Sequence, residues 1–147
     1  MGEFTISNDR ETLDFDLIFR LLTTETYWAR DRSFEIVKKS FQNSMPFVIL
    51  SGKETCGFAR VVTDYANFAW IADVFIREEF RGSGLSKFLM REILAHRDLQ
   101  DVKRWVLATK DAHGLYRQFG FDALIIPEIW MERTPPNTYG KFDDEEN

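Results

Sequence analysis

Residues 71–89 read I-A-D-V-F-I-R-E-E-F-R-G-S-G-L-S-K-F-L, and this stretch predicts the centre of the fold. An apolar run of strand length ends at Ile76, and a glycine-rich turn at residues 81–84 then leads into a helical pattern. Such a turn directs backbone amides at an anion, and the positive end of the helix dipole favours negative charge at the same place. We therefore expect a phosphate-bearing ligand at residues 81–86.

The chain after this turn alternates between helical and strand patterns. Apolar residues at helical spacing follow the glycines, and residues 102–109 then predict a strand. Because a helix separates this strand from the strand predicted at residues 68–76, a parallel pairing is expected. A short helix should then end at Gly120, and residues 121–126 and 129–133 are predicted to be the final strands.

The chain before the turn predicts two amphipathic helices and an antiparallel meander. Residues 15–22 and 34–41 show the apolar spacing of helices, and the connector between them contains Tyr27 and Trp28. From Pro46 onward the period changes to that of strands, and two turns separate three of them. The predicted fold class is a single mixed α/β layer structure. Its parallel pair, formed after an antiparallel meander, can splay apart and admit a ligand.

The composition fits one globular domain. With 147 residues, of which 44% are apolar and fourteen are Phe, the chain can bury a core without disulfides or metals. We expect the domain to span residues 1–134 and residues 135–147 to form a flexible acidic tail. A formal charge of −5 argues against nonspecific binding to nucleic acid or anionic membranes, and favours cationic partners.

The sequence also limits the cofactors and the cellular location. The single cysteine, Cys56, excludes an internal disulfide and is predicted to be a small buried residue rather than a nucleophile. Two separated histidines offer no metal-ligand spacing, so no metal is expected. No signal peptide is visible and no apolar run reaches membrane-spanning length, which predicts a cytoplasmic protein without a membrane partner.

Two segments together resemble the GNAT N-acetyltransferase superfamily. Residues 81–86, R-G-S-G-L-S, are similar to the acyl-CoA pyrophosphate loop R/Q-x-x-G-x-G/A of that family. Residues 112–121, A-H-G-L-Y-R-Q-F-G-F, look like its A-x-x-L-Y-x-x-x-G-F segment. Two residues depart from the family pattern. The family prefers Gly or Ala at the position of Ser86, and it often has Asn at the position of Thr109. The resemblance implies a GNAT-like central mixed sheet of about six or seven strands flanked by four helices, with strands 4 and 5 parallel and splayed.

The resemblance implies that acetyl-CoA is the cosubstrate. Gly82 and Gly84 would let the phosphates approach the backbone or supply the φ that the turn requires, and Arg81 would add a donor. In the family, backbone groups at positions 74–76 hold the pantetheine arm, and an amide there polarises the acetyl carbonyl. The implied cofactor-binding residues are Val74, Phe75, Ile76, Arg81, Gly82, Ser83, Gly84, Leu85, Ser86, Thr109 and Tyr116.

Tyr116 and Asp73 are the candidate catalytic residues. The resemblance implies that Tyr116 is the general acid that protonates the departing CoA thiolate, whereas a core aromatic is the alternative. Asp73 shares a strand face with apolar neighbours, so desolvation should raise its pKa and make it a better base for an ammonium substrate. A structural carboxylate paired with Arg60 or Arg104 is the alternative for Asp73.

The amine acceptor is the part that the sequence determines least. The connector with Tyr27 and Trp28 predicts a wall of a substrate pocket, and a staple between two helices is the alternative. Glu128, near a predicted cleft edge, is a further substrate contact or base, and His113 is another candidate base. The acidic chain favours a cationic small amine, while a protein N-terminus or lysine, the acyl-chain preference and a homodimer all stay open.

These features together predict an acetyl-CoA-dependent N-acetyltransferase in which a primary amine attacks the thioester directly. The main alternative is a noncatalytic acyl-CoA-binding or regulatory module on the same fold, which would keep the phosphate loop and lack a workable acid and base. A nucleotide-binding α/β protein is a further alternative, but no Lys-Ser/Thr pair of the Walker type follows the glycines.

Overall fold

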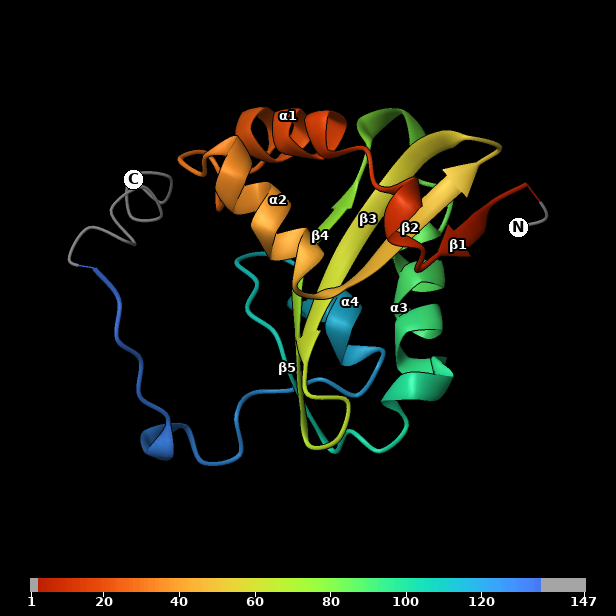
Figure 1. Ribbon diagram of the computed structural model, residues 1–147. Helices are drawn as coiled ribbons and strands as arrows, with labels where there is room; N and C mark the ends of the chain where they lie inside the picture. The colour runs from red at the N-terminus through yellow and green to blue at the C-terminus, as the bar shows by residue number, and fades with distance from the viewer. Residues whose placement is uncertain (1–2, 136–147) are drawn as a thin grey trace.

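A five-stranded mixed sheet forms the centre of the protein, whose computed structural model describes residues 3–135 (Figure 1). Its strands are β1 (Thr5–Ser7), β2 (Met45–Ser51), β3 (Glu54–Thr63), β4 (Phe68–Ile76) and β5 (Arg104–Val106). They lie side by side in the order of the sequence. The pairs from β1 to β4 are antiparallel, whereas β4 and β5 are parallel.

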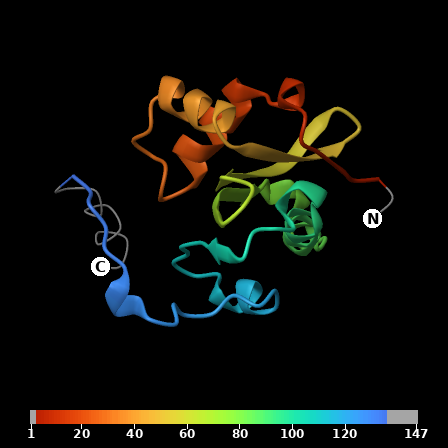
Figure 2. The ribbon, with the colours of Figure 1, turned by 60° about the horizontal axis from the view of Figure 1, so that its bottom comes forward.

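Helices cover both faces of this sheet. They are α1 (Phe15–Glu25), α2 (Phe34–Gln42), α3 (Leu85–Ala95) and α4 (His113–Arg117). Figure 2 shows α1 and α2 on one side of the sheet, and α3 and α4 on the other. Short 3₁₀ turns occupy Arg10–Thr12, Glu78–Phe80, Arg97–Leu99 and Pro127–Ile129. The mixed sheet and the four helices confirm the predicted fold class.

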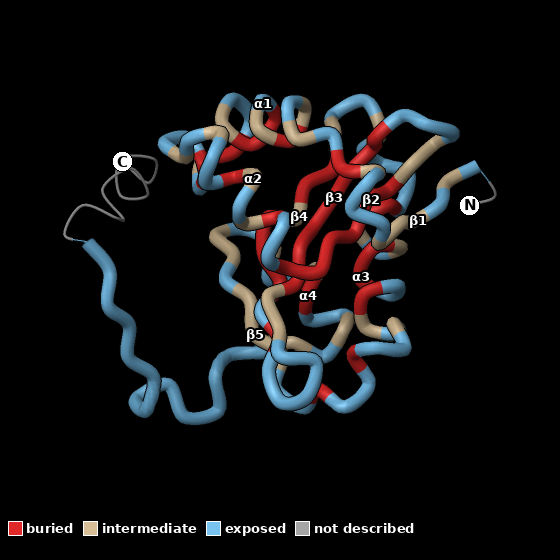
Figure 3. The backbone as a smooth tube through the Cα atoms, in the orientation of Figure 1, coloured by how far each residue is buried: buried red, intermediate tan, exposed pale blue. Residues whose placement is uncertain are grey.

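Two apolar clusters, one on each face of the sheet, hold the layers together. Successive strand residues point to opposite faces, so Phe47 and Ile49 of β2 pack in the cluster with α3, while Val48 packs in the cluster with α1 and α2. Phenylalanines fill much of the second cluster, where the rings of Phe41 and Phe58 meet edge to face with centroids 5.9 Å apart. Figure 3 shows the buried residues concentrated in the inner strands and on the inward sides of the helices.

Cys56, the only cysteine of the chain, lies in β3 and is fully buried. Burial, followed by the nearby charge of Glu54, raises the pKa of its thiol. Because the thiolate is the reactive form of cysteine, a buried thiol with a raised pKa is a poor nucleophile. The prediction of a small buried residue is confirmed.

β4 and β5 pair over only a short length, which leaves an opening in the sheet. The register joins residues 68–70 to residues 104–106, although β4 continues to Ile76. The predicted parallel pair is therefore confirmed, and the two strands separate after Trp70. The C-terminal ends of the two strands lead into α3 and α4. In α/β sheets this is the end of the strands at which ligands bind.

The prediction of six or seven strands is wrong, because the sheet has five strands within residues 3–135. Residues 121–126 and 129–133, predicted to be strands, form none, and from Asp122 onward the chain is an extended C-terminal arm, residues 122–135. Figure 3 shows this arm exposed along its length. Asp122 Oδ1 accepts a hydrogen bond from the Ala123 amide at 2.8 Å and Pro127 begins a 3₁₀ turn, so local turns replace strand pairing.

Two further expectations concern the ends and the surface of the molecule. The tail predicted at residues 135–147 lies, apart from Pro135, outside the described residues. Among residues 3–135, none of the helices has both the length and the apolar character that crossing a membrane requires.

Replacing Gly57 with alanine should destabilise the protein by about 1–3 kcal/mol, the usual cost of overpacking. Gly57 pairs with Ile76 across β3 and β4, and a Cβ there would lie 2.7 Å from the Phe75 carbonyl oxygen. Urea unfolding monitored by circular dichroism would measure the loss. The matched control is Gly114→Ala in α4, where a Cβ meets no atom within 4 Å. Equal unfolding midpoints for the two variants would contradict the close approach of β3 to β4.

Candidate active site

The glycine-rich turn lies at the C-terminal end of β4 and leads into α3. Gly82 and Gly84 have φ values of +85° and +77°, in the left-handed region that favours glycine. A Cβ on Gly82 would meet no atom within 4 Å, so the backbone angle, rather than crowding within the protein, calls for glycine there. The open space beside it leaves the backbone accessible to a ligand.

A hollow of about 310 Å³ lies beside this turn, and its lining favours an anion. Arg81, Lys87 and Ser86 border it, together with the first residues of α3. The first amides of a helix have no acceptor within the helix, and they stand at the positive end of its dipole. Arg81 Nε donates to the Ile76 carbonyl at 2.9 Å, which fixes this cation at the end of β4.

A bulge distorts β4 where it separates from β5. Phe58 of β3 pairs with Phe75, and Arg60 pairs with Ala72, so two residues of β4, Asp73 and Val74, lie opposite one residue of β3. Asp73 has a φ of +54°, which is uncommon for a residue other than glycine. On the other side of β4 the pairing with β5 has already ended at Trp70. The backbone of residues 73–76 therefore borders the opening between the strands.

Three side chains hold the buried carboxylate of Asp73, whose side chain is only 1% exposed. Arg60 Nε donates at 2.7 Å and an Arg32 Nη atom donates to both carboxylate oxygens at 2.8 and 2.9 Å. Trp28 Nε1 donates at 2.9 Å. Burial by itself raises the pKa of Asp73, but the charges and hydrogen bonds of Arg32 and Arg60 outweigh it and hold the pKa below its usual range.

These contacts correct one prediction and refine another. The expected rise in the pKa of Asp73 is wrong in direction, because the two arginines overcome the effect of burial. Pairing with Arg60 is confirmed, whereas the guanidinium of Arg104 lies 5.2 Å from the centroid of the Trp130 ring. Arg32 was not predicted as a partner of Asp73, because nothing in the sequence of the connector indicates which strand its charged residues meet.

The connector between α1 and α2 bridges the two sides of the opening in the sheet. On one side, Trp28 contacts Asp73 of β4. On the other side, the hydroxyl of Tyr27 accepts a hydrogen bond of 3.2 Å from the amide of Lys110, in the segment that follows β5. The two aromatic rings meet edge to face, with centroids 5.0 Å apart. The predicted aromatic wall thus lies across the point where β4 and β5 diverge.

Tyr116 lies on α4 beside this connector. The residue is 8% exposed, and its ring meets that of Phe121 at 6.1 Å between centroids. Burial, followed by the proximity of Asp111 and Tyr27, raises the pKa of the Tyr116 hydroxyl. The phenol is therefore neutral at pH 7 and able to donate a proton. Tyr116 therefore belongs to the core cluster and also lies near Tyr27 of the connector.

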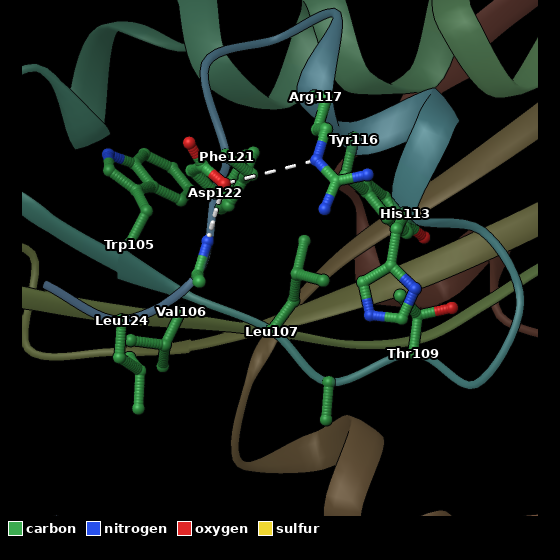
Figure 4. A pocket seen from close by; sticks show the side chains of 12 residues that line it. Trp105, Val106, Leu107, Thr109, His113, Tyr116, Arg117, Phe121, Asp122 and Leu124 are labelled. Carbon is green, nitrogen blue, oxygen red and sulfur yellow. Dashed lines mark hydrogen bonds and ion pairs between the residues drawn. The ribbon is translucent and has the colours of Figure 1, made fainter. Parts of the chain in front are cut away.

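A hollow of about 460 Å³ lies beside β5, and Figure 4 shows the side chains that line it. Thr109, His113 and Tyr116 line it, together with neighbouring residues of β5 and residues 121–124. The hydroxyl of Thr109 accepts a hydrogen bond from the Ala112 amide at 3.1 Å, so it shapes the turn that begins α4. The dashed line from Arg117 to Asp122 marks an ion pair of 3.9 Å.

The structure brings most of the predicted site residues together, with one exception. Tyr27 and Trp28 lie next to Asp73 and Tyr116, around the end of β4. Glu128 lies on the exposed C-terminal arm and lines neither the hollow at Tyr116 nor the hollow at the glycine turn. Within residues 3–135, no group of three or more His, Cys, Asp and Glu side chains is placed to hold a metal ion.

Comparisons with known proteins agree with this arrangement. Residues 15–121 match the Acetyltransferase (GNAT) family. A curated relative from Gracilaria tenuistipitata var. liui, an uncharacterized N-acetyltransferase named ycf52, is 34% identical over 95 residues. These residues are 63% of this chain and 48% of the relative, so the chain spans about half the length of that protein.

Solved structures share the fold. A crystal structure of a GNAT family protein from Xanthomonas campestris pv. campestris is 42% identical, covers 95% of this chain and 98% of its own, and gives a TM-score of 0.89. A GNAT family acetyltransferase from Elizabethkingia anophelis, solved with acetyl-CoA bound, is 17% identical with a TM-score of 0.64, over 94% of this chain and 92% of that one. The matched region contains the glycine turn, the diverging strands β4 and β5, and helix α4 with Tyr116. The chain belongs to the acetyltransferase (GNAT) family.

Proposed function

We propose that this protein transfers an acetyl group from acetyl-CoA to a primary amine by direct attack. The main support is that the glycine turn, which favours an anion, and the buried Tyr116 both lie beside the opening between β4 and β5. The family match supports acetyl transfer, and the bound acetyl-CoA of the Elizabethkingia relative supports the choice of cosubstrate.

The residues at the glycine turn fit the phosphates of CoA. Positive-φ glycines, the first amides of α3, and the cations Arg81 and Lys87 all favour negative charge at one place. The bulged segment at residues 73–76 offers backbone groups along the opening, where a pantetheine arm can lie as an additional strand. When bound, acetyl-CoA supplies an activated thioester, and an amide of this segment would stabilise charge on its carbonyl oxygen.

In this proposal Tyr116 holds the proton that the departing sulfur takes up. Burial keeps the phenol protonated, and its position on α4 places it beside the Tyr27 wall. Asp73 is a weaker candidate for the base than the sequence indicated, because three donors stabilise its ionised form. We assign Asp73 a positioning role that keeps Trp28 and Arg32 against β4. His113, exposed at the rim of the hollow near Tyr116, is the remaining candidate to accept a proton from the amine.

A noncatalytic acyl-CoA-binding module is the second candidate. It shares the glycine turn but has no need of a tyrosine with a raised pKa next to an aromatic wall. The presence of Tyr116 at that place therefore favours the enzyme.

Calorimetry with CoA, followed by thiol detection over a panel of amines, tests the proposed function. We expect CoA to bind and at least one amine, most readily a cationic one, to cause release of free CoA thiol from acetyl-CoA. Binding without thiol release for any amine would support the noncatalytic module. Absence of CoA binding by the folded protein would refute both candidates.

Tyr116→Phe should lower kcat by roughly 10²-fold, because general acid catalysis typically contributes 10²–10⁴-fold. The affinity for CoA, measured by calorimetry, should change little, since the ring and its packing remain. In the wild type, the rate should fall only when the pH rises past the raised pKa of Tyr116, and the variant should lack this alkaline limb. A large loss of CoA affinity with an unchanged kcat would instead make Tyr116 a packing residue.

Asp73→Asn should destabilise the protein at neutral pH by about 3–5 kcal/mol, because it leaves buried arginine charge without a counterion. The lowered pKa means that ionised Asp73 stabilises the fold above the unfolded-state pKa near 4, and that this contribution is lost as the pH falls through the folded-state pKa. Urea unfolding of both proteins at decreasing pH should therefore show the difference shrinking below about pH 4. A difference that does not depend on pH would contradict the ionised state of Asp73.

A further inference from the structure

The C-terminal arm exposes several large apolar side chains. Ile125 and Met131 are 96% and 95% exposed, and Ile129 is 66% exposed. Leu124, Ile126 and Trp130 on the same arm are also exposed. Contiguous apolar surface of this kind marks a surface that binds a partner. Figures 1 and 2 show the arm extending away from the sheet and the helices.

The outer edge of β5 is open in the same structure. Within residues 3–135, β5 is the last strand of the sheet and pairs only with β4, so the backbone N–H and C=O groups on its other side have no neighbouring strand in that part of the chain. Two hollows lie at this edge: the one of about 460 Å³ beside Tyr116, and a second of about 620 Å³. The second is bounded by residues 103–106 and by Ile126, Ile129 and Trp130 of the arm. The arm thus forms the far wall of a space beside β5 without filling it.

The sequence of the arm suits an added strand. It contains the β-branched residues Ile125, Ile126 and Ile129, a residue type that is enriched in strands, and residues 121–126 and 129–133 were predicted to be strands. Backbone hydrogen bonds close local turns in the arm, from the Ile129 amide to the Ile126 carbonyl and from the Trp130 amide to the Pro127 carbonyl. The ion pair between Asp122 and Arg117, and the bond from the Ala123 amide to Asp122, hold the chain where it turns away from β5.

The charges of the edge and of the arm are complementary. Lys103 and Arg104 stand just before and at the start of β5, whereas Glu128 lies on the arm. The guanidinium of Arg104 already lies 5.2 Å from the centroid of the Trp130 ring.

Every copy of the chain carries one open edge and one exposed arm. In two copies related by a two-fold axis, each arm can therefore cover the open edge of the other copy. An extended chain gains about 3.3–3.6 Å per residue, so the arm can reach roughly 45 Å.

We propose that the occupant of the open β5 edge is the C-terminal arm of a second copy of this chain, in a symmetric dimer formed by exchange of arms. The incoming arm lies along residues 105–109 and covers apolar surface that both copies otherwise expose. Because Thr109, His113 and Tyr116 line the hollow at this edge, the arm of one copy completes a wall of the candidate active site of the other. The inference concerns assembly and does not depend on the proposed reaction.

Light scattering coupled to size-exclusion chromatography, over a wide range of protein concentration, is the primary test. The wild type should have the mass of a dimer, and Ile125→Glu combined with Ile129→Glu should have the mass of a monomer. The matched control is Ile36→Glu on α2, an isoleucine that is 51% exposed and far from the arm in the sequence, which should remain a dimer. A wild type that is monomeric at every concentration, or a dimer that persists in the double variant, overturns the proposal.

Hydrogen exchange distinguishes an exchanged arm from other arrangements. Amides of residues 105–109 should be protected in the wild-type dimer and should exchange at least about tenfold faster in the double variant, because their partner strand is lost. Unchanged protection in the double variant would place the contact elsewhere and overturn the proposal. A wild-type monomer with protected residues 105–109 would show that the arm folds back on its own β5, and this outcome would also overturn the proposal. Circular dichroism of the variants confirms that they are folded.

Discussion

The buried carboxylate of Asp73 is the interaction on which the site depends. It joins the bulge of β4 to Arg60 of β3 and to two residues of the connector, Trp28 and Arg32. A residue other than glycine with a positive φ is strained, and it persists only where the surroundings hold it. Four hydrogen bonds to one carboxylate, three of them from cations, provide that hold. The same group therefore sets the shape of the β4 backbone and the position of the aromatic wall that faces it.

The residues on the two sides of the opening between β4 and β5 are arranged around the Asp73 carboxylate. The glycine turn and the start of α3 favour anions, and they are fixed to β4 through the bond from Arg81 to the Ile76 carbonyl. On the opposite side, Tyr27 ties the connector to the segment after β5, which leads to Tyr116. In the proposed function, cofactor binding and proton transfer are thus assigned to different elements, and hydrogen bonds to Ile76 and Lys110 fix the position of each.

The sequence predicted the α/β class, the four helices, the parallel pair and the glycine turn, because those depend on local periodicity and on backbone angles at residues such as Gly82 and Gly84. It misjudged features that depend on partners distant in the chain. The pKa of Asp73 moved opposite to the expectation because Arg32, 41 residues away, reaches the carboxylate. Residues 121–126 and 129–133 contain residue types that favour strands, but a strand also needs a neighbouring strand, and residue types alone do not supply one.

The burial of Cys56 has a chemical consequence for a protein of this family. A thioester reacts readily with thiolates, so an accessible cysteine near the site would compete with an amine for the acyl group. The only thiol of this chain is enclosed in β3, and its pKa is raised by that enclosure. The fold therefore offers a thioester no sulfur nucleophile of its own, and the protein is protected from acylating itself at cysteine.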